Sequence, residues 1–263
     1  MMNAKPSGTA RKVALNIVAL GSRKGMEKIL PPGIEDATAQ LLVASGVVNW
    51  SGVWFYQSKM ALWIYTGFDW MMPGQFEAFA HRKAFCERQV REGLARGAGQ
   101  VLVLGAGYDT LGWRLAPEFP DVTFFEIDHP ATARLKAKGI AQMGARENLE
   151  LIAEDLGKRG LGEVLSANGR WRPEASSVIV AEGLLMYLPV KAVEDLLKQC
   201  AEVCSTGSRL AFTYIGTLEN GRPDAGPCTG WVLWMLQSVG EPWLWSIQPD
   251  ELGRFLEKNR WTA

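Results

Sequence analysis

A glycine turn with polar neighbours stands near the middle of the chain. Gly105-Ala106-Gly107 ends the apolar run Val101–Leu104 and precedes Asp109-Thr110, which leads into a predicted helix. Because glycine carries no side chain, the backbone there can turn tightly and come close to a ligand. A buried strand followed by a Gly-x-Gly turn and a helix is typical of a site for a nucleotide-like cofactor at the end of a parallel sheet.

The residue three positions after the second glycine narrows the choice of cofactor. A dinucleotide-binding turn has a third glycine there, which lets the helix pack close to the strand and face a pyrophosphate. This chain has Thr110 at that position, so the turn favours a cofactor without pyrophosphate over NAD. S-adenosylmethionine fits, since its methionine part requires close backbone approach and a few polar partners.

Two acids stand at the end of the second predicted strand, about 20 residues after the turn, where a ribose diol would find its acceptors. Glu126 and Asp128 are two positions apart and point to the same face of a strand, so the pattern alone does not choose between them. The alternative role for one of them is to cap the helix that starts after Pro130.

Acids also follow the third and fourth predicted strands. Asp155 and the backbone N–H after it match the amino group and ring nitrogen of an adenine edge, although an acid there is also typical of a surface loop. Glu182 precedes a glycine, where a carboxylate would hold a cofactor's ammonium or a substrate donor. Of the two histidines, His129 is predicted to start a helix and His81 to lie on a helix surface or pack against the core.

The elements that position these residues alternate along the chain. Short apolar runs separated by helix-like stretches predict a parallel α/β sheet with right-handed crossovers. The predicted strands are Val101–Gly105, Val122–Asp128, Leu149–Ala153, Ser177–Glu182 and Arg209–Ile215. The predicted helices include Gln75–Arg96, Ala131–Met143 and Val190–Cys204.

After the fifth predicted strand, the alternation of strands and helices gives way to a loop-like composition. Gly216–Gly230 is rich in Gly, Pro, Asn and Asp and predicts a loop. A helix over Trp231–Val239, a short strand over Trp243–Ile247 and a helix from near Asp250 are expected to follow.

Composition limits the classes of partner. Lys plus Arg and Asp plus Glu number 28 each, so no net charge attracts nucleic acid or anionic membrane. Polar residues interrupt the aromatic segment Val47–Met72, and no signal-peptide arrangement opens the chain. The four cysteines lack Cys-x-x-Cys spacing, which predicts free thiols in a reduced cytoplasmic protein without a structural metal. They are Cys86, Cys200, Cys204 and Cys228.

In order and spacing, several segments resemble the leucine carboxyl methyltransferase family, in particular its bacterial S-adenosylmethionine-dependent O-methyltransferases of small-molecule pathways. These segments are QVLVLGAGYDT from Gln100 with Arg114-Leu115, FEIDHP from Phe125, Asp155-Leu156, and AEGLLMYL from Ala181. The resemblance covers roughly residues 80–215. It implies a Rossmann-like class I methyltransferase sheet with helices on both faces and an N-terminal helical cap. The implied division is a cap over 1–75 and a core over 76–263, with a substrate-covering insertion over 216–245.

The resemblance also implies roles for the acids and the turn. Asp128 rather than Glu126 would take the ribose hydroxyls, and Asp155 and Leu156 would contact adenine. The turn of Gly105 and Gly107 would pass beside the methionine part, with Glu182 near its amino-acid end.

An arginine on the helix before the first strand grips the cofactor carboxylate in this family. Arg82 is the best match, with Arg88 and Arg91 as alternatives, and a guanidinium fork suits a carboxylate. Two departures stand out. Leu111 occupies a position that is usually arginine in bacterial relatives. The chain also ends at Ala263, where the family fold continues into a final antiparallel strand, so we expect either a trimmed sheet or a truncated chain.

Many of the eleven tryptophans lie outside the predicted sheet. They are expected either to pack the cap onto the sheet, which is the commoner use, or to wall a pocket for a flat, apolar substrate. They are Trp50, Trp54, Trp63, Trp70, Trp231, Trp234, Trp243 and Trp245.

The predicted reaction is in-line attack of a small molecule's carboxylate or hydroxyl oxygen on the sulfonium methyl, with an acceptor of the polyketide type as one candidate. Tyr187, beside the end of the fourth strand, is the candidate for orienting the substrate; its alternative is a core aromatic. Two other functions are considered. Leu111 and the short C-terminus motivate a methyltransferase-like binding protein without turnover. The glycine turn alone motivates a nicotinamide-dependent reductase, against which Thr110 argues.

Overall fold

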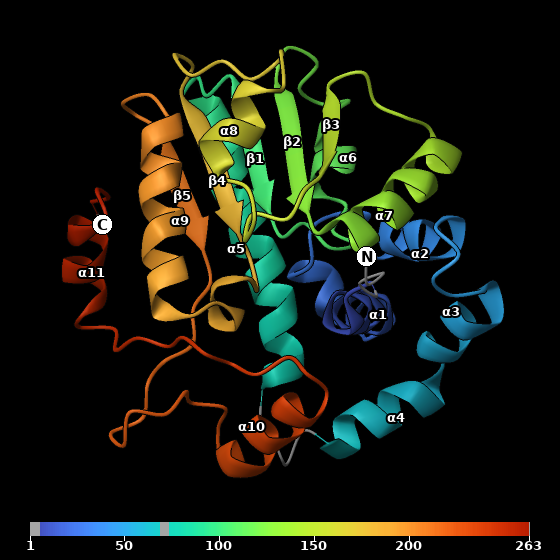
Figure 1. Ribbon diagram of the computed structural model, residues 1–263. Coiled ribbons are helices and arrows are strands. Elements are labelled where there is room, and N and C mark those ends of the chain that lie inside the picture. The colour runs from blue at the N-terminus through green and yellow to red at the C-terminus, as the bar shows by residue number, and fades with distance from the viewer. Residues whose placement is uncertain (1–5, 69–73, 263) are drawn as a thin grey trace.

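The computed structural model describes residues 6–68 and 74–262, and Figure 1 shows a sheet covered by helices. Five parallel strands form this sheet in the order β3-β2-β1-β4-β5, which confirms the predicted α/β fold. They are β1 (Gln100–Leu104), β2 (Thr123–Asp128), β3 (Leu149–Ala153), β4 (Ser177–Ala181) and β5 (Arg209–Phe212). The order changes direction between β1 and β4, and such a switch point opens a crevice at the carboxyl ends of the strands.

Helices cover both faces of the sheet, which is why the strands are continuous apolar runs rather than alternating ones. Val101 and Val103 of β1 pack with one core cluster, and Leu102 and Leu104 with the other. The first cluster includes α5 (Gln75–Ala95), α6 (Leu111–Leu115) and α7 (Pro130–Met143). The second includes α8 (Leu161–Ser166), α9 (Val190–Val203) and α11 (Leu252–Lys258).

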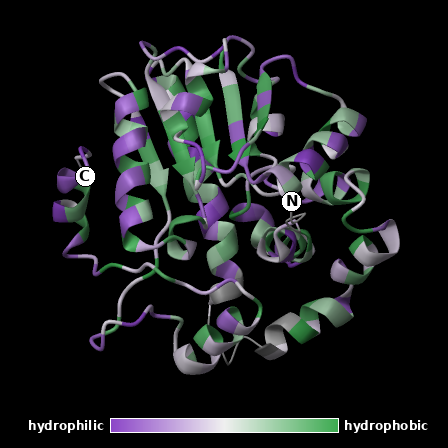
Figure 2. Ribbon diagram, in the orientation of Figure 1, coloured by the Kyte–Doolittle hydropathy of each residue, from purple (hydrophilic) through white to green (hydrophobic). Residues whose placement is uncertain are grey.

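The N-terminal helices lie beyond the carboxyl ends of the strands (Figure 1). α1 (Gly8–Gly21) packs against α2 (Ile34–Ala44) and α5, and α2 packs against α7. The short helix η1 (Met26–Lys28) follows α1, and α3 (Trp50–Tyr56) and α4 (Lys59–Phe68) follow α2. Figure 2 shows hydrophobic strands at the centre and hydrophilic residues along α9. Within the described ranges, no helix has the length and apolar character needed to cross a membrane.

The segment after β5 differs from its prediction. α10 (Thr229–Ser238) forms as expected, but the strand predicted over Trp243–Ile247 does not, and that prediction is wrong. The physical reason is that the backbone of this segment donates to carbonyls of a short helix and of the loop after β5 instead of to a strand. Leu244 N and Trp245 N both donate to Met186 O, and Ile247 N donates to Ile215 O. Met186 belongs to the short helix η2 (Leu185–Tyr187), so these bonds fasten the segment beside the end of β4.

The tryptophans match their expected roles only in part. Trp245 packs into the core beside Phe255, but most of the others are exposed and none of the described tryptophans lines the cavity described below. The exposed ones are Trp50, Trp54, Trp63, Trp231 and Trp234. Trp70 lies outside the described residues. These five side chains therefore do not wall the cavity, and each has at least 46% of its surface exposed.

Candidate functional site

A large cavity lies at the carboxyl ends of β1, β2, β3 and β4, with α1 along its other side. Its volume is about 660 Å³, which is within the range of small-molecule sites. The lining residues come from α1, α2 and α5, from the ends of these strands and the loops after them, from α8 and α9, and from residues 240–242. All eight residues singled out from the sequence line this cavity: Arg82, Gly105, Gly107, Asp128, Asp155, Leu156, Glu182 and Tyr187.

The turn after β1 forms the floor of the cavity with its backbone. Gly105 and Gly107 have φ values of +64° and +48°, a region that side-chain-bearing residues rarely adopt. A Cβ on Gly105 would also lie 2.9 Å from the Leu184 Cδ1 atom. The backbone conformation therefore favours glycine at position 105, a Cβ there would also displace the end of the Leu184 side chain, and the turn leaves its backbone open to a ligand.

The structure distinguishes the two acids of β2. Glu126 is buried, and its Oε2 atom lies 2.5 Å from Lys136 Nζ in an ion pair away from the cavity. Asp128 lines the cavity, and its Oδ2 atom accepts from Gly107 N at 2.6 Å. Neither acid caps the following helix, because His129 Nδ1 accepts from Ala131 N there.

Burial dominates the electrostatics of both acids. It raises the pKa of the Glu126 carboxyl despite the neighbouring Lys136. It also raises the pKa of Asp128, against the opposing hydrogen bond from Gly107 N.

Charged side chains from α5 meet the end of β4. Arg82 Nε and Nη2 both donate to Glu182 Oε1, at 3.2 and 3.1 Å. Gly183 follows with φ +63°, and a Cβ there would lie 3.1 Å from Arg82 Nη2, so glycine makes room for the guanidinium. Gly183 N donates to Thr213 Oγ1 at 2.8 Å, which fixes the turn that presents Glu182.

The other two candidate arginines are elsewhere. Arg91 pairs with Glu87 and Glu118, and Arg88 is exposed near Glu92. Neither lines the cavity, so of the three only Arg82 does.

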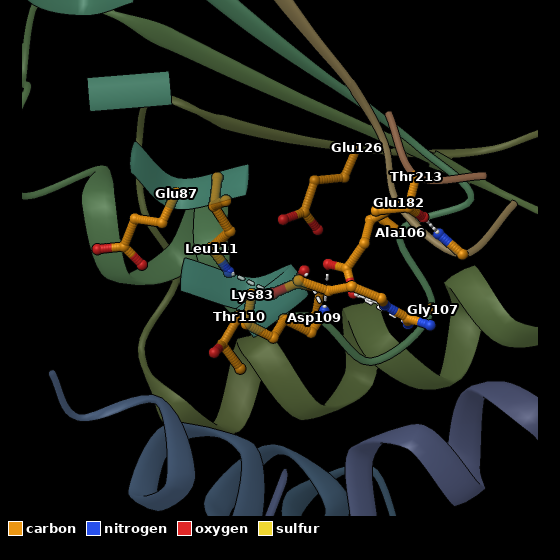
Figure 3. A network of polar contacts seen from close by, with 12 residues as sticks. Lys83, Glu87, Ala106, Gly107, Asp109, Thr110, Leu111, Glu126, Glu182 and Thr213 are labelled. Carbon is orange, nitrogen blue, oxygen red and sulfur yellow. Dashed lines mark hydrogen bonds and ion pairs between the residues drawn. The ribbon is translucent and has the colours of Figure 1, made fainter. Parts of the chain in front are cut away.

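Sequence reasoning missed the neighbour of Arg82. Lys83 Nζ lies 2.7 Å from Asp109 Oδ2 and 2.9 Å from Glu182 Oε2, and Figure 3 shows its ammonium between the two carboxylates. Burial opposes the charge on Lys83, but the carboxylates of Asp109 and Glu182 outweigh it and hold its pKa above the usual range. Burial acts against ionised Asp109 as well, and Lys83 outweighs it, so the pKa of that carboxyl is lowered. An Arg-Lys pair on the helix facing the Gly-x-Gly-x-Asp loop was the available signal.

Asp155 and Leu156 line the cavity just after β3. Asp155 Oδ1 accepts from Gly157 N at 3.1 Å and Oδ2 lies 3.0 Å from Lys158 Nζ. The hydrogen bond from Lys158 is the main reason that the pKa of Asp155 is lowered. Asp155 therefore lines the cavity, and its carboxylate is held by Gly157 N and Lys158 within the loop after β3.

Tyr187 lies on η2, after β4, and lines the cavity. Burial raises the pKa of its phenol, and the negative charge of Glu241 adds to the increase. Glu241 also lines the cavity and accepts from Thr9 N at 3.2 Å, so it ties the segment after α10 to the start of α1. Of the histidines, His129 lines the cavity and His81 is exposed on α5.

Neither metal nor disulfide chemistry is indicated among the described residues. No group of three or more His, Cys, Asp or Glu side chains is placed to hold a metal ion there. The four cysteines are free thiols.

Comparisons with known proteins identify a family and relatives named as methyltransferases. The family model described as leucine carboxyl methyltransferase matches residues 17–201. A candidate S-adenosyl-L-methionine-dependent methyltransferase of Streptomyces avermitilis is 34% identical over 169 residues, covering 62% of this chain and 58% of that protein. A similarly named protein of Mycobacterium ulcerans is 30% identical over 188 residues, covering 70% of this chain and 59% of that protein. The chain thus spans somewhat more than half the length of these relatives.

A solved structure shows the same fold. The crystal structure of a candidate methyltransferase of Thermobifida fusca has a TM-score of 0.55 and 21% identity, and the match covers 86% of this chain and 82% of that one. The fold of this chain is the Rossmann-like fold of class I methyltransferases, as predicted from the sequence.

Proposed function

Because this chain belongs to the leucine carboxyl methyltransferase family, we propose that it binds S-adenosylmethionine in the cavity and transfers the methyl group to an oxygen of a small molecule. The observation that carries the proposal is the convergence of the eight predicted residues on one cavity, from five separate segments of the chain. The names of the relatives support the methyl donor.

The residues present fit the cofactor. Gly105 and Gly107 line the cavity without side chains, so the backbone of the turn is open to close approach by a ligand. Asp128 places a carboxylate at the end of β2, where it would accept from ribose hydroxyls. Arg82 and Glu182 carry opposite charges side by side, and would take the carboxylate and the ammonium of the amino-acid end. Asp155 and Leu156 would border the adenine.

The protein's share of the chemistry would be positioning and exclusion of water. Bound S-adenosylmethionine supplies an activated methyl group on its sulfonium. α1 closes the cavity with apolar side chains, among them Val13, Ala14 and Ile17. Tyr187 would orient the acceptor. We assign residues 1–75 to the cap, 76–263 to the core and 216–245 to the segment that covers the substrate.

The charges in the cavity favour a hydroxyl over a carboxylate as acceptor. Acidic lining residues outnumber the basic ones, and Lys83 is already bound between two carboxylates. With Arg82 engaged by the cofactor, a substrate carboxylate would meet net negative charge. A neutral hydroxyl or phenol would meet none of this repulsion.

The test has a binding arm and a turnover arm. Calorimetry with S-adenosylmethionine and S-adenosylhomocysteine is expected to give dissociation constants in the micromolar range. Methyl transfer from labelled cofactor is then followed across hydroxyl- and carboxyl-bearing small molecules. Alkaline treatment releases methanol from methyl esters but not from methyl ethers, and so identifies the acceptor oxygen.

Each result discriminates among functions. Binding with no transfer to any acceptor supports a methyltransferase-like binding protein. No binding of either compound by folded protein overturns the proposal, and binding of NAD(P)H instead supports a reductase.

A further inference from the structure

Lys83 joins three parts of the cavity wall that are far apart in the sequence. Its ammonium lies 2.7 Å from Asp109 Oδ2, in the loop after β1, and 2.9 Å from Glu182 Oε2, after β4. Lys83 itself belongs to α5. The three side chains are only 11%, 9% and 4% exposed. A charge so buried is retained only where it is well paired, so this contact constrains all three segments.

The two oxygens of Glu182 have different partners. Oε1 accepts from Arg82, whose side chain is a quarter exposed (25%), whereas Oε2 faces the more deeply buried Lys83. Arg82 and Lys83 balance the charges of Asp109 and Glu182, so this four-residue cluster is neutral without a ligand. A zwitterionic ligand preserves that balance by exchange: its carboxylate takes Arg82, and its ammonium takes the Oε1 atom that Arg82 leaves.

Such an exchange requires Glu182 to stay in place when Arg82 changes partner. Lys83 is the group that can hold it, because its ammonium forms an ion pair with the other oxygen of Glu182. Asp109 in turn fixes Lys83. Asp109 Oδ1 accepts from Leu111 N at 2.9 Å, which holds the Asp109 carboxylate at the start of α6 (Figure 3).

We propose that Lys83, held by Asp109, is a positioning residue that keeps Glu182 oriented for the ammonium of an amino-acid-bearing nucleoside. This inference rests on the proposed function. It assigns Lys83 no contact with the ligand, and it predicts selectivity: Lys83 matters for the amino-acid end of the ligand and not for its nucleoside.

Two ligands distinguish the amino-acid end from the nucleoside. S-adenosylhomocysteine carries the amino-acid end, and 5′-methylthioadenosine lacks it while keeping the thioether and the adenosine. Dissociation constants for both are measured by calorimetry on the full chain, for the wild type and for Lys83→Gln. The exposed Lys138→Gln is the matched control, since it removes the same charge from a helix surface.

Lys83→Gln is expected to weaken S-adenosylhomocysteine binding roughly 10- to 100-fold, as loss of a charge-assisted contact does, with 5′-methylthioadenosine changed less than about threefold. Lys138→Gln is expected to change neither. Equal weakening of both ligands, or of neither, overturns the proposal. If Lys83→Gln does not fold, Asp109→Asn replaces it, with the same selective loss expected and the same outcomes overturning the idea. Failure of the wild type to bind either compound overturns the proposed function itself.

Discussion

Removing the cation of the buried Glu126–Lys136 pair is expected to lower the stability of the folded chain by an amount that depends on pH. The two side chains are 1% and 2% exposed, so Lys136→Met leaves a carboxylate without its counter-ion between the sheet and α7. Breaking a buried pair from one side costs about 3 to 5 kcal/mol of unfolding free energy. At about 2 to 4 °C of melting temperature per kcal/mol, the melting temperature should fall by roughly 6 to 20 °C near neutral pH.

The sign of the pH dependence follows from Glu126. Burial already raises its pKa in the folded protein, and loss of Lys136 removes the nearest opposing charge. The folded variant then binds a proton that the unfolded chain releases, so its stability rises as the pH falls through the folded-state pKa toward the ordinary glutamate value. The loss relative to wild type should therefore be smaller at about pH 5.5 than at about pH 7.5.

The assay is denaturant unfolding at both pH values, followed by circular dichroism. Lys138→Met on the exposed side of α7 is the matched control, and should stay within about 0.5 kcal/mol of wild type. The double variant Glu126→Leu with Lys136→Met should recover most of the loss, because it leaves no charge buried. A loss below about 1 kcal/mol, or one that does not depend on pH, would refute the reasoning.

Three further outcomes test the site and the surface. Gly105→Ala should weaken S-adenosylhomocysteine binding at least tenfold and cost about 1 to 3 kcal/mol of stability, because φ is +64° and the new Cβ would meet Leu184; calorimetry and denaturant unfolding measure the two effects. Asp128→Ala should weaken binding of adenosine but not of 2′,3′-dideoxyadenosine, because the second compound lacks the ribose 2′- and 3′-hydroxyls that would donate to Asp128; titration of both ligands measures this. Trp54→Ser and Trp234→Ser should leave the unfolding free energy within about 0.5 kcal/mol of wild type, and cofactor affinity unchanged, because both side chains are largely exposed and outside the cavity; unfolding curves and calorimetry check this.

Each of these outcomes has a contrary one. An Ala at position 105 that binds normally would show that the turn does not approach the ligand. Equal losses for both nucleosides at Asp128→Ala would point to a loop effect through Gly107 instead of a diol contact. A large loss at either tryptophan would mean that it has a structural partner in the folded chain.

The strands and the residues at their ends could be predicted from the sequence, whereas contacts that depend on packing could not. Strands buried on both faces read as apolar runs, so β1 and β4 stand out, and the glycines and acids that end such strands must meet at one edge. The pairing of Lys83 with two carboxylates depends on the packing of α5 against the sheet, which the Arg82-Lys83 pair in the sequence does not by itself specify. The segment Trp243–Ile247 has strand-like residues, but its backbone N–H groups donate to carbonyls of η2 and of the loop after β5 rather than to a strand. The exposure of Trp54 was missed because an aromatic side chain is usually buried.

The position of β1 in the sheet also affects how the chain folds during its synthesis. β1 pairs on one side with β2, where Gln100 lies opposite Thr123, and on the other with β4, where Gln100 lies opposite Ser177. During synthesis the second edge of β1 stays unpaired until residues 177–181 leave the ribosome. An apolar strand with an open edge is a template for intermolecular pairing. Chains released before Ser177 should therefore aggregate. The cavity should form late in folding, because β1, which precedes the glycine turn, cannot complete its pairing until β4 has been synthesised.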